Sequence, residues 1–122
     1  MEYDPDKETW HPICLGWPES ALVGWLMLHQ AHLEHLWNDK GPTEEALQLL
    51  LAGQRSPDAL DPDHWTVLLA VHAYHDATVA GPSLHDLLNL QGPLSYPVAH
   101  WMAACMTGTL DAWIDEQLHR RH

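Results

Sequence analysis

The sequence predicts an all-α fold, a single compact bundle of five to six helices with an irregular N-terminal arm. Apolar residues recur at helical spacing over most of the chain, and Gly and Pro divide it into segments of helical length. Alternating apolar residues occur only near the N-terminus, so strands have little support. A length of 122 residues suits one domain, with an extended arm over residues 1–17 and helices over residues 18–119.

The first helix is expected over residues 18–38. Pro18 is favourable at a first helical position, and the Gly41-Pro42 pair stops a helix that precedes it. A helical wheel gives one apolar stripe, which consists of Leu22, Trp25, Leu26, Leu33, Leu36 and Trp37. His29 falls within this stripe, so its side chain is expected to face the core.

The second and third helices are expected over residues 43–53 and 61–80. Thr43 is a favourable N-cap, and Asp61 is followed by the proline and the acidic residue that typically begin a helix. The inner face of the second helix is expected to hold Leu47, Leu50 and Leu51. The apolar side of the third is expected to hold Leu68, Val71, His72, His75 and Val79.

Two further helical segments complete the prediction. Ser83 and Asp86 have the spacing of a capping box and open a short helix that runs to Gln91. Residues 97–119 form the last segment, either as one helix or as two that are separated at Gly108.

The charge balance excludes some partners and favours others. The formal net charge is −12, from 17 acidic and 5 basic residues, and no Lys or Arg occurs between Ser56 and His119. Nucleic-acid binding needs clustered basic residues, so neither DNA nor RNA is expected as a direct partner. An anionic membrane surface is disfavoured for the same reason. A basic protein suits this field better.

The remaining composition indicates a cytoplasmic protein. Cys14 and Cys105 do not form a disulfide framework by number or spacing, so reduced thiols are expected. The acidic N-terminus lacks the apolar segment of a signal peptide. The longest apolar run, residues 21–28, is too short to span a bilayer.

These observations lead to the hypothesis of a non-enzymatic protein–protein interaction module. Such a protein would be an inhibitor or immunity-type protein that mimics nucleic-acid charge and occupies a basic surface of its partner. The candidate surface consists of Asp58, Asp61, Asp63, Asp111, Asp115 and Glu116. It requires the start of the third helix to lie beside the C-terminal helix. Common catalytic motifs are absent, because the glycines are isolated and no G-x-S-x-G, C-x-x-C or H-E-x-x-H occurs.

The alternative hypothesis is a helical bundle that binds a divalent metal, up to and including a small metal-dependent hydrolase. His72 and His75 are three residues apart on one helical face, and His29 on another helix is a candidate third ligand. Zinc or nickel suits imidazole ligands. The same histidines can instead hydrogen-bond to backbone carbonyls or other side chains in the core, because a buried imidazole must satisfy both ring nitrogens.

Overall fold

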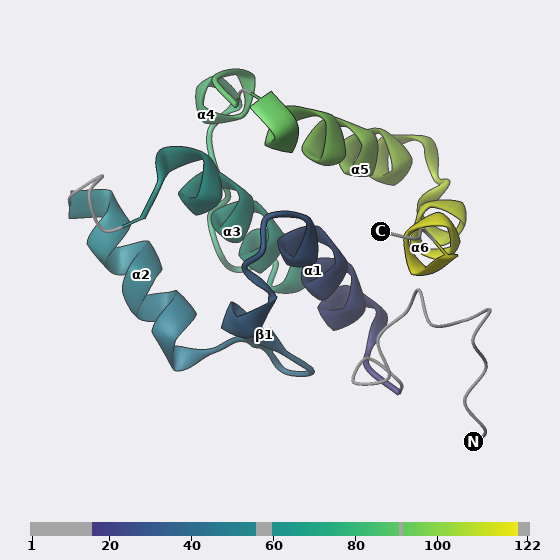
Figure 1. Ribbon diagram of the computed structural model, residues 1–122, viewed down its shortest axis with the longest axis horizontal. Helices are drawn as coiled ribbons and strands as arrows, with labels where there is room; N and C mark the ends of the chain where they lie inside the picture. The colour runs from purple at the N-terminus through teal and green to yellow at the C-terminus, as the bar shows by residue number, and fades with distance from the viewer. Residues whose placement is uncertain (1–15, 56–59, 91, 120–122) are drawn as a thin grey trace.

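The computed structural model describes residues 16–55, 60–90 and 92–119, and these residues form an all-α fold (Figure 1). The described part contains six α-helices, two short 3-10 helices and one small hairpin, which confirms the predicted fold class. The predicted N-terminal arm lies outside the described residues except for its last two positions.

Helix α1 spans Glu19–Gln30 and ends before the predicted boundary at residue 38. The cause is His32, which adopts the left-handed conformation with a φ of 59°. The N–H of Leu33 then bonds to the carbonyl of Leu28 at 2.8 Å, which is the hydrogen bond of a Schellman motif. The chain therefore turns back on its own helix, and the prediction of one continuous helix is wrong.

The segment after α1 forms a 3-10 helix, η3 (Glu34–Leu36), and a two-stranded hairpin. Its strands are β1 (Trp37–Asn38) and β2 (Gly41–Pro42), which pair antiparallel. Strands this short carry little stability themselves. The hairpin instead positions one aromatic side chain, Trp37, against α1.

Trp37 joins the hairpin to α1 by a hydrogen bond and by close packing. Its Nε1 donates to the carbonyl of Ala21 at 2.7 Å, and the side chain is buried. Gly24 lies directly beneath the indole, and a Cβ at that position would come within 2.4 Å of the ring. A glycine inside a helix is unfavourable by about 1 kcal/mol, so this contact is its structural reason.

Helices α2 (Glu44–Arg55) and α3 (Pro62–His75) begin at the predicted caps. The Thr43 hydroxyl accepts a hydrogen bond from the N–H of Ala46, and the Asp61 carboxylate accepts one from the N–H of Asp63. Both N-terminal predictions are confirmed.

The ends and faces of these two helices differ from the prediction. Helix α3 stops at His75 rather than near residue 80, because Asp76 is extended and its carboxylate accepts hydrogen bonds from Thr78. The predicted inner face of α2 is also partly wrong. Leu50 is buried, but Leu51 is 60% exposed.

The C-terminal part contains three helices. Helix α4 (Leu84–Leu88) begins with the predicted capping box, and the 3-10 helix η4 (Gly92–Leu94) leads into α5 (Ser95–Thr107). Gly108 then adopts the left-handed conformation with a φ of 73°, and α6 (Leu110–His119) follows. The last segment is therefore two helices, separated where the sequence allowed a break.

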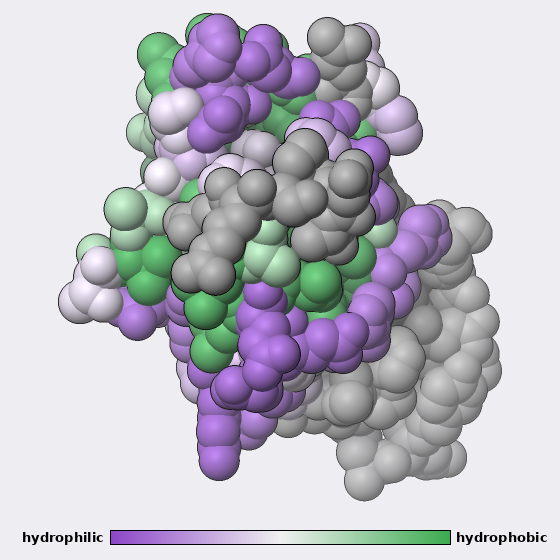
Figure 2. All heavy atoms as spheres, turned by 90° about the vertical axis from the view of Figure 1, so that its left-hand side faces the viewer, coloured by the Kyte–Doolittle hydropathy of each residue, from purple (hydrophilic) through white to green (hydrophobic). Residues whose placement is uncertain are grey.

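Helix α1 is central to the arrangement. It packs against α3 and the hairpin on one side and contacts α5 and α6 on the other, while α2 packs against α3 (Figure 1). Figure 2 shows the side of the molecule on which α2 lies, and hydrophobic atoms are visible there among hydrophilic ones. Across the described residues, no helix has the length and apolar character needed to cross a membrane.

Candidate functional site

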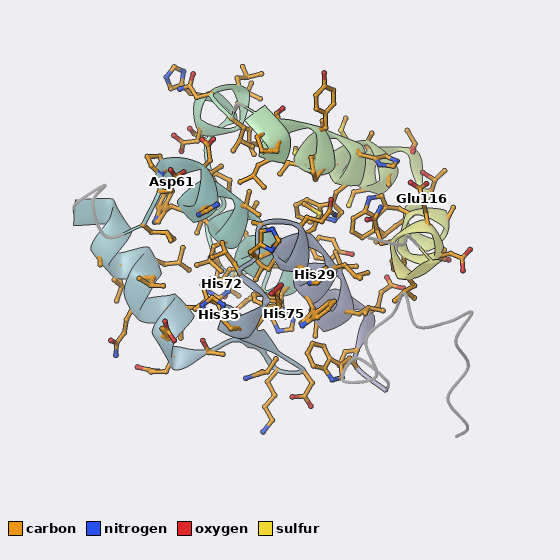
Figure 3. All side chains as sticks on the ribbon, in the orientation of Figure 1. His29, His35, Asp61, His72, His75 and Glu116 are labelled. Carbon is orange, nitrogen blue, oxygen red and sulfur yellow. The ribbon has the colours of Figure 1, made fainter. Side chains whose placement is uncertain are left out.

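The structure divides the predicted acidic surface into two groups. Asp61 and Asp63 lie at the start of α3, whereas Asp111, Asp115 and Glu116 lie on α6. Figure 3 shows the labelled Asp61 and Glu116 on opposite sides of the molecule. The predicted juxtaposition of these two helices is therefore not formed, because α1 and α5 lie between them (Figure 1). Asp58 lies outside the described residues.

The two acidic residues at the start of α3 stabilise the beginning of that helix. The Asp61 carboxylate caps the helix, and Asp63 is half-buried in its first turn. These two carboxylates line a hollow of about 320 Å³ together with His32 and His64. Negative charge in the first turn favours a helix, so this group contributes to local stability as well as to the surface field.

The group on α6 is presented to solvent. Asp111, Asp115 and Glu116 are all exposed, and Asp111 and Asp115 are four residues apart on one helical face. Glu116 also lines a depression between α5 and α6. Helix α6 turns its opposite face inward, where Trp113 and Gln117 are buried. The acidic side chains therefore cover the outer side of a helix that is well anchored in the fold.

His29 does not face the core, and that prediction is wrong. Its side chain is 55% exposed, and Nδ1 lies 2.9 Å from a carboxylate oxygen of Glu34. The imidazole stacks on the indole of Trp25, with ring centroids 4.8 Å apart. The early end of α1 explains the difference, because η3 places Glu34 beside the last turn of the helix. His29 therefore belongs to a hydrogen-bonded pair with Glu34 at the surface.

His75 is a half-buried junction between three elements. Its Nε2 lies 3.1 Å from the carbonyl oxygen of Lys40, and its Nδ1 lies 3.0 Å from the hydroxyl of Ser20. A carbonyl can only accept, so Nε2 donates to it, and Nδ1 of a ring protonated only at Nε2 accepts from the Ser20 hydroxyl. Both ring nitrogens of His75 thus have hydrogen-bond partners. The ring also contacts Trp37 edge-on. A Cβ at Gly41 would lie 2.7 Å from the imidazole, so this position has no space for a side chain.

His72 lies on the same helix but is not satisfied in this way. Its Nδ1 is buried and has no hydrogen-bond partner among the described residues. Desolvation lowers the pKa of His72 below its ordinary value of 6.5, although the Asp76 carboxylate opposes this shift. Asp76 itself has a lowered pKa, chiefly because its carboxylate accepts a hydrogen bond from the Thr78 hydroxyl.

The three histidines of the metal hypothesis are not brought together. Among the described residues, no group of three or more His, Cys, Asp or Glu side chains has an arrangement that could hold a metal ion. A metal at His75 would have to displace the Ser20 or Lys40 hydrogen bond, and His29 is directed to Glu34. His75 is hydrogen-bonded as the other sequence interpretation expects, whereas His72 Nδ1 has no partner among the described residues and His29 is exposed.

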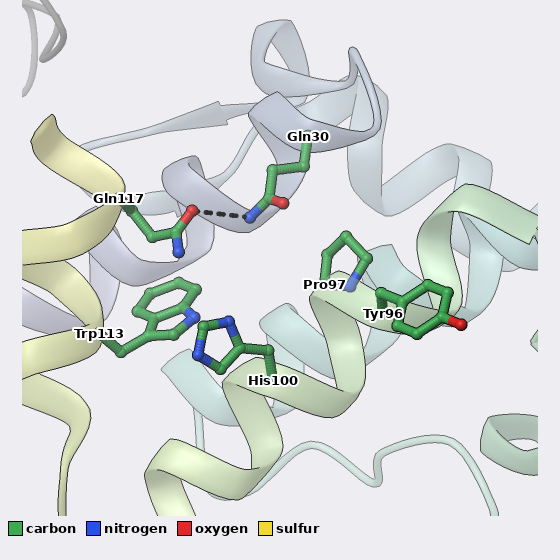
Figure 4. A pocket seen from close by; sticks show the side chains of 6 residues that line it. All are labelled: Gln30, Tyr96, Pro97, His100, Trp113 and Gln117. Atoms are coloured by element: carbon green, nitrogen blue, oxygen red, sulfur yellow. Dashed lines mark hydrogen bonds between the residues drawn. The ribbon is translucent and has the colours of Figure 1, made fainter. Parts of the chain in front are cut away.

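A polar cluster between α1, α5 and α6 was not predicted from the sequence. Gln30 Nε2 donates to Gln117 Oε1 at 3.3 Å, and Figure 4 shows this bond beside Trp113 and His100. The Nε1 atoms of Trp113 and Trp101 are buried without a hydrogen-bond partner among the described residues. Such an unmet donor costs about 1–3 kcal/mol. The large number of tryptophans was the only sequence signal, because the burial of each indole depends on how the helices pack.

No known protein family matches the chain, and the comparisons found neither a curated protein nor a solved structure that is similar to it.

Proposed function

We propose that this chain is a non-enzymatic interaction module that binds a partner protein through a basic surface of that partner. The observation that carries the proposal is the exposure of Asp111, Asp115 and Glu116 on α6. This helix belongs to a long stretch, Ser56 to His119, without any Lys or Arg. An inhibitor or immunity-type protein that occupies a nucleic-acid-binding surface has this charge character.

The α6 carboxylates are the better candidates for direct contact. At the start of α3, Asp61 caps the helix and Asp63 is half-buried, so only one of these two carboxylates is exposed. On α6 the acidic residues are exposed and the apolar face is already packed against the bundle. We therefore assign the contact surface to α6 and expect the α3 pair to contribute to the long-range field.

The physical effect of such a surface is mainly kinetic. An exposed ion pair contributes only about 0–1 kcal/mol, so three carboxylates do not by themselves give tight binding. An array of one sign does accelerate the encounter with an oppositely charged partner, by factors of about ten or more at low salt. Salt screens this attraction over roughly 10 Å at 0.1 M ionic strength.

The test is the association rate of the natural partner as a function of salt. The partner is captured from the source cells with untagged protein and purified, and association is followed by stopped-flow fluorescence. Replacing Asp111→Asn, Asp115→Asn and Glu116→Gln together should slow association about tenfold at low salt and flatten its salt dependence. Dissociation should change less.

Two further sets of substitutions, each of which removes two carboxylates rather than three, serve as controls. Glu44→Gln with Glu45→Gln removes two exposed carboxylates from α2 and should change the rate far less. Asp61→Asn with Asp63→Asn removes charge from α3 while Asn preserves the N-cap, and an intermediate effect is expected. A partner whose association is independent of salt, and equally fast with the α6 variant, would contradict the proposal.

A further inference from the structure

The helices α5 and α6 enclose a groove that consists of two adjoining hollows. One has a volume of about 270 Å³ and is lined by Gln30, Tyr96, Pro97, His100, Trp113 and Gln117. The other has a volume of about 160 Å³ and is lined mainly by small residues of the two helices. His100 and Trp113 line both hollows, so they form the wall between them. We call the two together the α5–α6 groove.

The groove offers hydrogen-bond capacity that the fold does not use. Trp113 is 3% exposed, and its Nε1–H has no acceptor among the described residues. Figure 4 shows this nitrogen on the edge of the indole that faces His100. Gln117 is buried, and its Oε1 is held by Gln30. An occupant must therefore bring an acceptor, such as a carbonyl oxygen, for the indole N–H.

The described charged residue on the lining of the groove is acidic. Among the described residues, no Lys or Arg lines either hollow, and Glu116 lies on the rim of the smaller one. The exposed Asp111 and Asp115 follow on the same helix. At the other end lies Tyr96, which is 82% exposed, and tyrosine is among the residues that most often dominate binding energy at interfaces.

We propose that the α5–α6 groove binds an extended basic segment of the partner protein, with a backbone carbonyl of that segment accepting the Trp113 N–H and Lys or Arg side chains lying beside Glu116. This inference rests on the proposed function and locates its contact surface. Two small, open hollows in a row can take alternate side chains of an extended segment, because successive side chains point to opposite sides and residues i and i+2 face the same surface.

Binding requires one local movement. The Trp113 nitrogen is covered in the free protein, whereas the neighbouring His100 is exposed and belongs to the walls of both hollows. Side-chain rotamer changes of this kind are common when interfaces form. We expect rotation of His100, whose ring lies beside the indole (Figure 4), to open the donor to the carbonyl.

The test follows the indole N–H signals of the folded, ¹⁵N-tryptophan-labelled protein by NMR. The probe is a synthetic octapeptide in which Lys and Arg alternate with Ala, and the control probe carries Glu in place of Lys and Arg. We expect the basic peptide to shift the Trp113 signal and the acidic peptide to leave it in place. Trp113→Phe identifies the signal, retains an aromatic ring and should weaken binding about three- to tenfold.

The matched control is Trp101→Phe, because Trp101 also carries a buried N–H without a partner among the described residues but does not line the groove. It should leave peptide affinity unchanged. If Trp113→Phe does not fold, His100→Ala serves instead, and removal of this cover should strengthen binding about twofold or more.

The outcomes separate this inference from the proposed function. If the basic peptide binds while the Trp113 signal stays in place, the groove is not the site, and an acidic interaction module remains supported. If acidic and basic peptides shift Trp113 equally, the charge selectivity of the groove is overturned. If neither peptide binds and the natural partner associates independently of salt, the proposed function falls as well.

Discussion

The two halves of the fold treat their tryptophans differently. In the half formed by α1, the hairpin, α2 and α3, Trp37 donates to the carbonyl of Ala21 and Trp65 donates to that of Leu50. In the α5–α6 half, Trp101 and Trp113 are as deeply buried as Trp37, but neither indole N–H has a hydrogen-bond partner among the described residues.

Exposed apolar side chains occur in both halves, and Leu51 of α2 is 60% exposed, but the most exposed ones lie after α3. Leu84, Leu88 and Tyr96 at the junction of α4 and α5 are each more than 70% exposed. Large aliphatic and aromatic side chains with this exposure are typical of surfaces that bind other proteins. Trp37 and Trp65 of the first half thus have acceptors for their N–H groups, whereas Trp101 and Trp113 of the second half have none among the described residues. The most exposed apolar side chains also lie in the part of the chain from α4 onward. A binding function is therefore expected in the second half.

The largest predicted effect concerns the Trp37 contact in the first half. Gly24→Ala places a methyl group within 2.4 Å of the indole, so the free energy of unfolding should fall by about 3 kcal/mol. Urea denaturation measures this change. In a Trp37→Ala background the clash is gone, and the same substitution should instead stabilise the helix by about 1 kcal/mol. An equal loss in both backgrounds would show that the indole does not explain Gly24.

The second prediction concerns His72, the polar group that breaks the pattern of the first half. His72→Phe removes a buried nitrogen without a partner among the described residues and should raise the free energy of unfolding at neutral pH by about 1 kcal/mol. The variant should also respond less to acid. Because burial lowers the pKa of His72 from 6.5, the unfolded chain takes up the proton first. His72 therefore does not reduce the free energy of unfolding through protonation above pH 6.5. Below that pH the free energy of unfolding falls until the lower pKa of the folded state is reached.

Urea denaturation at several pH values between about 8 and 5 tests this sign. The exposed His85 provides the control, because His85→Phe should leave the slope unchanged. A His72→Phe variant that loses stability on acidification as steeply as the parent protein would argue against the role of desolvation.

The smallest predicted effect compares the same helix-end position in the two halves. After α1 this left-handed position holds His32, and after α5 it holds Gly108. His32→Gly should raise the free energy of unfolding by about 0.5 kcal/mol, because glycine adopts this conformation without strain. Gly108→Ala should lower it by about 1 kcal/mol through backbone strain alone, since nothing lies within 4 Å of the added Cβ. Thermal denaturation of both variants should give shifts of opposite sign.

Local signals made most of the helix starts predictable. Thr43, Asp61 and the Ser83–Asp86 pair act on the backbone within three residues, so their roles could be inferred without knowledge of the fold. The end of α1 was missed because His32 occupies a position where glycine is the usual signal. The helical wheel placed His29 on the inner face because it assumed one helix to residue 38. Since α1 ends at Gln30, the residues after it do not extend that face.

The site was less predictable than the fold. The acidic residues were identified from composition, but whether α3 and α6 lie side by side depends on long-range packing, which the spacing of charges does not encode. The groove was not predicted, because Gln30, His100 and Trp113 come from three helices that are separate in sequence. The hydrogen bonds of His75 to Ser20 and Lys40 also required the tertiary structure.

The close packing of the Trp37 indole on Gly24 restricts which residues homologous proteins can have at these two positions. Any side chain at position 24 would enter the space that the indole fills, so these two positions can vary only together. Distant homologues should have either Gly at position 24 with Trp at position 37, or a larger residue at position 24 with a much smaller one at position 37. This coupled pair, thirteen positions apart, is a more discriminating signature of the lineage than its helix pattern, because amphipathic helices recur in unrelated chains.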